Sequence, residues 1–119
     1  MTDSHLASVR EYYARVDAGD IPGLLALFDD RAAYARPGYP VLHGTDALSA
    51  FYRETRVIAE GTHALIDMVA AGGHVAVQGR FNGRLKDGSA SEVRFADFFR
   101  FNERGLIQRR DTYFFRAAV

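Results

Sequence analysis

The first half of the chain carries hydrophobic residues at helical spacing. A first helix is predicted for residues 3–19, between an N-cap at Asp3 or Ser4 and an end at Gly19. The inward stripe of this helix would consist of Leu6, Val9, Tyr13 and Val16, with Tyr12 on its flank. Such a stripe must be buried against another layer of structure.

Two more helices are predicted before the pattern changes. Residues 20–28 continue the helical spacing, with Pro22 in the first turn and Phe28 as the last inward residue. Residues 32–44 are too rich in proline and glycine for a helix, so we expect a short strand and a loop. A third helix is expected over residues 45–61.

After Gly61 the hydrophobic period changes from helical to alternating. Strands are expected at residues 63–71, 74–85, 91–101 and 106–115. Tight turns join them, such as the one at Gly72 and Gly73. The chain therefore predicts an α+β fold in which three N-terminal helices pack on one face of a curved antiparallel sheet.

Composition narrows the class of protein. The 119 residues contain 15 Lys and Arg against 15 Asp and Glu, which disfavours a nucleic-acid binder because such proteins show a basic face. The absence of cysteine excludes disulfides and thiolate chemistry. No apolar run is long enough to span a membrane, and the N-terminus lacks a signal-peptide pattern. We therefore expect a single domain, residues 1–119, in the cytoplasm.

The segment RFADFFRF, residues 94–101, combines four phenylalanines with one carboxylate. Alternation along a strand places Phe95, Asp97, Phe99 and Phe101 on one face, which should be the inner one. Desolvation disfavours a charged carboxylate. An acid at this position therefore serves as a neutral hydrogen-bond donor, or it accepts bonds from a buried arginine or from backbone amides.

Two stretches, residues 13–54 and 96–114, carry a family resemblance. They resemble bacterial ketosteroid isomerase and, more broadly, the SnoaL-like polyketide cyclases of the nuclear transport factor 2-like superfamily. The resemblance runs over nearly the whole chain, from about Tyr12 to Phe114. It implies a cone-shaped fold with a hydrophobic pocket for a small molecule, no cofactor and a homodimer. It does not by itself imply one reaction, because this fold carries several.

The resemblance implies roles for three residues. The isomerase family forms an oxyanion hole from a tyrosine on the first helix and a protonated aspartic acid on a strand, and these motifs fall on Tyr12 and Asp97. In some members a second tyrosine supports the first, and it matches Tyr52. A neutral Asp97 would donate a hydrogen bond to a substrate oxygen as negative charge develops there.

The chain departs from the isomerase pattern at the general base. Ungapped alignment places Ala35 at that position, with Arg36 beside it. An arginine stays protonated at neutral pH and cannot take up a proton. Arg36 would instead bind a carboxylate or phenolate of the substrate, or it would only cover the loop.

Asp111 is a second candidate for the base. It lies in RRDTYF, which resembles the Arg-Asp ending of the last strand in limonene epoxide hydrolase and several SnoaL-like cyclases. Alternation, however, aims Arg110, Thr112 and Phe114 at the pocket and Asp111 away from it, unless a bulge reverses the order. An outer-face ion pair is therefore the alternative role for Asp111.

The histidines are weaker candidates for a base. His43 and His63 lie near the ends of predicted elements, where we expect them to cap a helix or to face solvent. No pair of histidines has a spacing typical of a metal site, so we expect no metal.

Inward aromatic and aliphatic side chains predict the walls of the pocket. They are Phe28, Phe51, Val77, Phe81, Phe95, Phe99, Thr112 and Phe114. Such a cavity suits a flat hydrophobic carbonyl compound or a polyketide-like small molecule. The leading hypothesis is a cofactor-independent isomerase, cyclase or dehydratase of secondary metabolism that acts through an enol or enolate. The alternatives are epoxide opening, with Asp111 as base and Asp97 as acid, and a binding module without catalysis.

Three aromatic residues, Phe98, Tyr113 and Phe115, fall on the outer face of the predicted sheet. They would form an exposed apolar patch unless something covers them. We expect a second copy of the chain to do so, in a homodimer. The alternative is cover by a helix or by the C-terminal residues 116–119.

Overall fold

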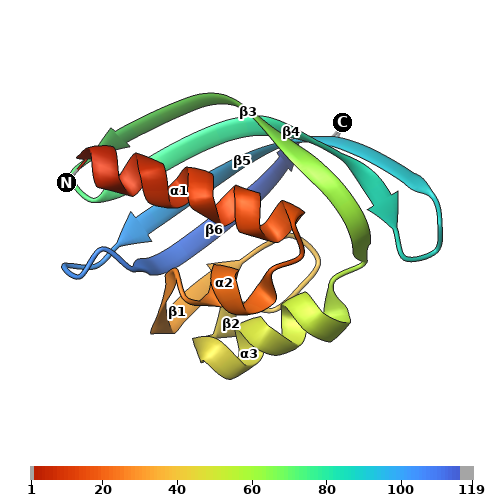
Figure 1. Ribbon diagram of the computed structural model, residues 1–119, viewed down its shortest axis with the longest axis horizontal. Coiled ribbons are helices and arrows are strands. Elements are labelled where there is room, and N and C mark those ends of the chain that lie inside the picture. The colour runs from red at the N-terminus through yellow and green to blue at the C-terminus, as the bar shows by residue number, and fades with distance from the viewer. Residues whose placement is uncertain (1, 116–119) are drawn as a thin grey trace.

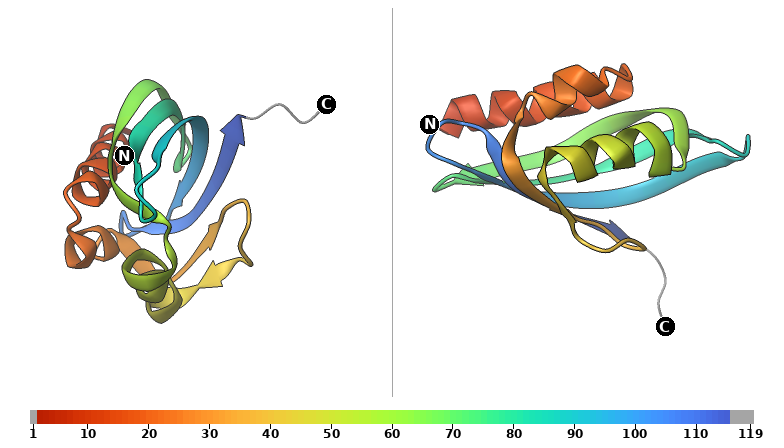
Figure 2. Two further views of the ribbon diagram at one scale, coloured as in Figure 1. Left: turned by 90° about the vertical axis from the view of Figure 1, so that its right-hand side faces the viewer. Right: turned by 90° about the horizontal axis from the view of Figure 1, so that it is seen from below.

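The computed structural model describes residues 2–115 and has an α+β fold, with the helices on one side of a curved six-stranded sheet (Figures 1 and 2). The helices are α1 (Thr2–Asp17), α2 (Ile21–Leu25), α3 (Gly44–Ala50) and the π-helical turn η1 (Phe51–Thr55) that continues α3. The strands are β1 (Phe28–Ala35), β2 (Leu42–His43), β3 (Ile58–Ala71), β4 (His74–Leu85), β5 (Ala90–Phe101) and β6 (Ile107–Phe115). Within the described residues, no helix is long and apolar enough to cross a bilayer.

The sheet is mixed, which corrects the prediction of a purely antiparallel one. The strand order is β2-β1-β6-β5-β4-β3, and β3 to β6 form the predicted antiparallel meander. Strand β1, however, pairs in parallel with β6, and Tyr34 lies opposite Arg110. This pairing brings an aromatic residue from the first half of the chain next to a cation near its end.

Two helix boundaries differ from the prediction because the sheet recruits the residues involved. Helix α2 ends at Leu25, and Phe28 starts β1 rather than closing a helix. The backbone N–H of Ile107 donates to the carbonyl oxygen of Leu27 at 2.8 Å, which ties this segment to the sheet. Strand β3 likewise begins at Ile58, inside the predicted third helix. Backbone pairing in the sheet thus overrides the local helical spacing.

Helix α1 runs across the inner face of the sheet (Figure 1). Val9, Tyr13 and Val16 of its predicted apolar stripe, and Tyr12 on the flank, are at most 7% exposed there, whereas Leu6 is only partly buried. The two adjacent tyrosines point inward side by side, with ring centroids 5.1 Å apart and nearly perpendicular planes. Both hydroxyl groups therefore enter the interior, where each must find a hydrogen-bond partner.

The outer face of the sheet carries exposed aromatic side chains, as predicted. Phe98, Tyr113 and Phe115 are 50%, 57% and 71% exposed. The described helices all lie on the other side of the sheet and do not cover them (Figure 2). Residues 116–119, the other predicted cover, lie outside the described residues.

We propose that a second copy of the chain covers this outer face. Phe115→Glu should dissociate the resulting dimer, because a charge buried at an apolar interface is strongly penalised. Sedimentation equilibrium at micromolar concentration should give about twice the mass of one chain for the wild type and the mass of one chain for the variant. Val41→Glu is the matched control, since Val41 is an exposed apolar residue outside this face. A monomeric wild type would contradict the proposal.

Candidate functional site

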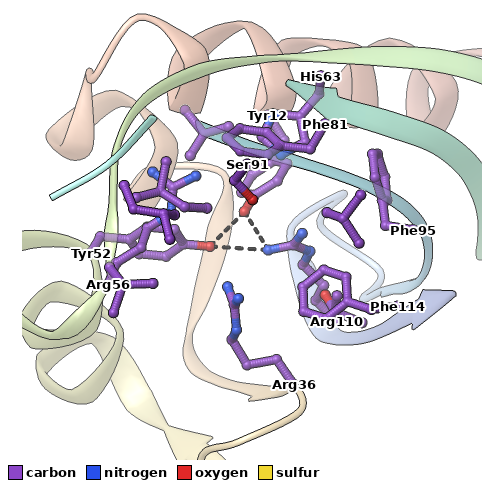
Figure 3. Close-up of a pocket in the computed structure, with 16 residues that line it drawn as sticks. Tyr12, Arg36, Tyr52, Arg56, His63, Phe81, Ser91, Phe95, Arg110 and Phe114 are labelled. Carbon is purple, nitrogen blue, oxygen red and sulfur yellow. Dashed lines mark hydrogen bonds between the residues drawn. The ribbon is translucent and has the colours of Figure 1, made fainter. Parts of the chain in front are cut away.

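A cavity of about 160 Å³ lies between α1, η1 and the inner face of the sheet (Figure 3). Phe81, Phe95 and Phe114 form apolar walls. Three arginines also line it: Arg36, Arg56 and Arg110. No aspartate or glutamate is among the lining residues that the structure describes, so the cavity combines aromatic walls with an excess of positive charge.

Arg110 is the buried centre of the polar end of this cavity. Its Nη2 donates to Oδ2 of Asp97 at 2.9 Å, and the side chains are 7% and 0% exposed. The hydroxyl groups of Tyr13 and Thr112 also donate to Asp97. Asp97 therefore accepts from three different side chains and holds Arg110 in place.

This arrangement corrects the role that the resemblance implied for Asp97. Its predicted burial is confirmed, but Asp97 does not line the cavity and makes no hydrogen bond to Tyr12. The neighbouring Tyr13 makes that bond instead. Oδ2 of Asp97 faces the guanidinium of Arg110, which can only donate, so Asp97 is an acceptor here and not the donor that the resemblance implied. The structure instead agrees with the alternative prediction, in which the inward acid accepts hydrogen bonds from a buried arginine.

The electrostatics of the pair keep Arg110 charged. Burial is the largest single effect and lowers the pKa of Arg110, but the Asp97 carboxylate together with the phenols of Tyr12, Tyr34 and Tyr52 outweighs it, and the pKa lies well above its ordinary value. The guanidinium also stacks 4.5 Å from the ring centroid of Tyr34 and 4.8 Å from that of Tyr12. Arg110 is thus a fixed cation at the polar end of the cavity.

Tyr12 and Tyr52 line the cavity beside Arg110, where Figure 3 shows their hydrogen bonds. Their hydroxyl oxygens lie 2.5 Å apart, and Nη1 of Arg110 donates to Tyr12 at 2.5 Å and to Tyr52 at 3.3 Å. One of the two hydroxyl protons forms the hydrogen bond between Tyr12 and Tyr52. The other has no acceptor among the described residues and is free for a ligand oxygen.

Both phenols remain neutral donors at physiological pH. Burial raises the pKa of Tyr52 to about 12 and the pKa of Tyr12 well above its ordinary value. Tyr52 lies on the π-helical turn η1, a widened turn of a kind often found at functional sites. The predicted pairing of Tyr12 with a supporting Tyr52 is therefore present in the geometry.

Arg36 reaches the cavity from the loop after β1, as Figure 3 shows, whereas Ala35 does not line it. Its guanidinium carbon lies 5.2 Å from the ring centroid of Phe51 and 5.3 Å from that of Phe114. Nη1 donates to the hydroxyl of Tyr34 at 3.3 Å, and the buried Nε has no partner. No carboxylate of the described residues pairs with Arg36, so its charge is open to an anionic ligand.

The predicted wall residues divide into two groups. Phe81, Phe95, Thr112 and Phe114 line the cavity. Phe28, Phe51, Val77 and Phe99 do not line it, and belong to the buried core behind it. The Tyr12 ring explains part of this correction, because it packs 5.7 Å from the centroids of both Phe28 and Phe99 and separates them from the cavity.

Asp111 lies outside the cavity, as strand alternation predicts and contrary to its candidacy as base. Its carboxylate accepts from Nε and Nη2 of Arg109, each at 3.0 Å. The register irregularity between β5 and β6 falls between Arg100 and Phe101, before this segment, so it does not reverse the order. Asp111 is an outer-face ion-pair residue.

Sequence reasoning missed the polar pair of His63 and Asp17. His63 lines the cavity rather than facing solvent, and its Nδ1 lies 2.5 Å from Oδ1 of Asp17. No local signal could have found this pair, because the two residues are 46 positions apart. Arg110 and Tyr13 were absent from the predicted site as well, although alternation already aimed Arg110 inward.

The described residues contain no group of three histidine, aspartate or glutamate side chains placed to hold a metal ion. The helices on one side of the curved sheet, with the polar-ended cavity between them and it, have the fold of solved nuclear transport factor 2-like structures. The chain belongs to the SnoaL-like domain family, whose model matches residues 9–110. The family resemblance seen in the sequence is thereby confirmed.

Several solved structures share the fold. A nuclear transport factor 2-like protein of unknown function from Burkholderia pseudomallei is 24% identical, with a TM-score of 0.85 over 94% of this chain and 91% of the other. SalBIII, an epoxide hydrolase/cyclase-like enzyme of pyran ring formation in salinomycin, is 21% identical, with a TM-score of 0.84 over 95% and 92%. TerC, co-crystallised with polyporic acid, is 18% identical, with a TM-score of 0.82 over 94% and 92%. At these identities the likeness establishes the fold and not the activity.

Proposed function

We propose that this protein is a cofactor-independent SnoaL-like enzyme that binds a hydrophobic carbonyl or polyketide-like compound and stabilises its enolate oxygen. The observation that carries the proposal is the Arg36 guanidinium, which lines the cavity and has no carboxylate partner among the described residues. An oxygen with developing negative charge would supply that partner. The reaction would be an isomerisation, cyclisation or dehydration.

The other lining groups fit the same ligand. A flat ring would pack against Phe81, Phe95 and Phe114, with its oxygen at the polar end beside the spare hydroxyl of the Tyr12–Tyr52 pair. Charge on that oxygen grows as the enolate forms, so these interactions strengthen in the transition state and accelerate the reaction. The co-crystallisation of TerC with an acid agrees with a ligand of this kind.

The volume of the cavity limits the size of the substrate. Its volume of about 160 Å³ is below the range of roughly 300–1,000 Å³ that is typical of sites for drug-sized ligands. A compound of one or two rings therefore fits better than a steroid. The absence of a lining carboxylate, where the isomerase has its base, also argues against steroid isomerisation.

Epoxide opening is less well supported. SalBIII is epoxide hydrolase/cyclase-like, but epoxide opening by this chain would require Asp111 as base and Asp97 as acid. Asp111 is paired with Arg109, and the cavity lining offers no other carboxylate. A binding module without catalysis remains the alternative, and it shares the anion-binding chemistry proposed above.

A pair of ring compounds tests the proposed function. 2-Naphthol and naphthalene share one ring system and differ by a single oxygen, so their affinities isolate the polar end of the cavity. A charge-assisted hydrogen bond is worth about 1.5–3 kcal/mol, so 2-naphthol should bind about 10 to 100 times more tightly. Isothermal titration calorimetry measures both affinities. Equal affinities would contradict the proposal.

A further inference from the structure

The His63–Asp17 pair lies at the wall of the cavity but takes no part in the oxyanion network. Asp17 is the last residue of α1, where the partial negative charge of the helix end disfavours an acid. Its carboxylate is compensated by His63, whose backbone N–H donates to Oδ2 at 2.9 Å and whose ring approaches Oδ1. A carboxylate at this unfavourable position thus has one evident partner, the histidine that lines the cavity.

The contacts of His63 fix both its tautomer and its orientation. A carboxylate accepts hydrogen bonds, so the proton of the neutral ring lies on Nδ1, and Nε2 carries a lone pair. No hydrogen bond from the described residues reaches Nε2. The ring packs against Tyr13, Phe81 and Phe95, with centroid distances of 5.1, 4.9 and 5.4 Å. The side chain is only 10% exposed, so its orientation is set by these neighbours.

The other lining residues leave the cavity without a proton acceptor. The three arginines have no lone pair available, and the phenols of Tyr12 and Tyr52 stay protonated. No carboxylate is among the lining residues in the described part of the chain. Among the described lining residues, His63 is the side chain whose ring nitrogen offers a lone pair that can accept a proton.

We propose that His63 is the general base of this cavity and that Asp17 is its positioning residue, an inference that rests on the proposed function. A C–H bond next to the substrate carbonyl breaks, and the proton moves to Nε2 of His63. The electron pair of that bond forms the C=C bond of the enolate, and the carbonyl π pair moves onto the oxygen near Arg36. The imidazolium, stabilised by Asp17, then returns a proton to the same carbon or to another atom.

Exchange of protons α to a carbonyl tests this step without knowledge of the natural substrate. 2-Tetralone is a two-ring ketone, and NMR in D₂O follows the replacement of its α protons by deuterium. The wild type should accelerate this exchange over buffer. His63→Gln should lower the catalysed rate by about 100-fold or more, while the affinity for 2-naphthol is unchanged. His43→Gln, a change at an exposed histidine, is the control and should keep the wild-type rate.

Two further variants separate a catalytic role from a structural one. Asp17→Asn should slow the exchange, because an amide no longer selects the Nδ1–H tautomer of His63. His63→Ala should regain catalysed exchange when imidazole is added, because the added base replaces the missing ring. A residue with a purely structural role would show no such recovery. Absence of rescue in a variant that still binds 2-naphthol would overturn the inference.

Different results would contradict the role of His63 and the proposed function. A wild type that prefers 2-naphthol to naphthalene but does not accelerate exchange would overturn the role of His63 and leave anion binding intact. A His63→Gln variant that catalyses the exchange at the wild-type rate would also overturn the role of His63 and leave anion binding intact. Equal affinity for 2-naphthol and naphthalene would instead remove the proposed function, and the inference with it.

Discussion

Replacement of Asp97 by alanine should destabilise the protein by about 3–5 kcal/mol, because it leaves a buried charge without its counterion. The carboxylate is 0% exposed and pairs with Arg110, whose side chain is 7% exposed. The hydroxyl groups of Tyr13 and Thr112 would also lose their acceptor. The free energy of unfolding, measured by urea denaturation with the slope checked for each variant, gives the size of the effect.

Asp111→Ala is the matched control for this experiment. Asp111 carries the same side chain on the adjacent strand β6 and also pairs with an arginine, but its side chain and that of Arg109 are 25% and 38% exposed. Water screens such a pair, so its loss should cost about 0–1 kcal/mol. Asp97→Asn should lie between the two, because it keeps the shape and removes the charge. Equal destabilisation by Asp97→Ala and Asp111→Ala would contradict the role assigned to Asp97.

Arg36→Met should weaken the binding of 2-naphthol by about 10 to 100-fold, which corresponds to the loss of one charge-assisted hydrogen bond. Methionine keeps much of the length and the apolar stem of arginine but cannot donate a hydrogen bond. The affinity for naphthalene, which has no oxygen, should stay the same. Calorimetric titration of both compounds separates the loss of the polar contact from a general distortion of the cavity.

Two other arginine variants serve as comparisons for Arg36→Met. Arg36→Lys keeps the charge but loses the planar fork that stacks between Phe51 and Phe114, so its affinity should be intermediate. Arg10→Met removes a charge from an exposed position on α1 and should leave 2-naphthol binding unchanged. An Arg36→Met variant that binds 2-naphthol as tightly as the wild type would show that the ligand oxygen lies elsewhere.

The buried network gives Asp97 and Arg36 different tasks. Asp97 neutralises Arg110 and fixes it beside the two tyrosines, so it contributes to stability and to the placement of the hydroxyl groups. Arg36 is held by aromatic rings and has no counterion among the described residues. The first change should therefore act mainly on unfolding and the second mainly on binding.

The sequence by itself determined the faces of the residues on β5 and on the second half of β6. Asp97 is buried, Thr112 faces the cavity and Asp111 faces outward, as alternation predicted. Phe98 and Tyr113 are exposed on the outer face for the same reason. Alternation is a property of the extended backbone and needs no knowledge of the neighbours.

Tertiary structure decided which of the inward groups meet. Tyr12 and Tyr13 are adjacent on α1 and about 100° apart around its axis, so only the docking of the helix determines which hydroxyl reaches Asp97. The same docking brings Asp17 to His63 across 46 positions. Local patterns fix the direction of a side chain relative to its own element, whereas hydrogen bonds between elements depend on how the elements pack. The fold class and the inner faces could therefore be predicted, but the network that links Asp97, Arg110 and the tyrosines could not.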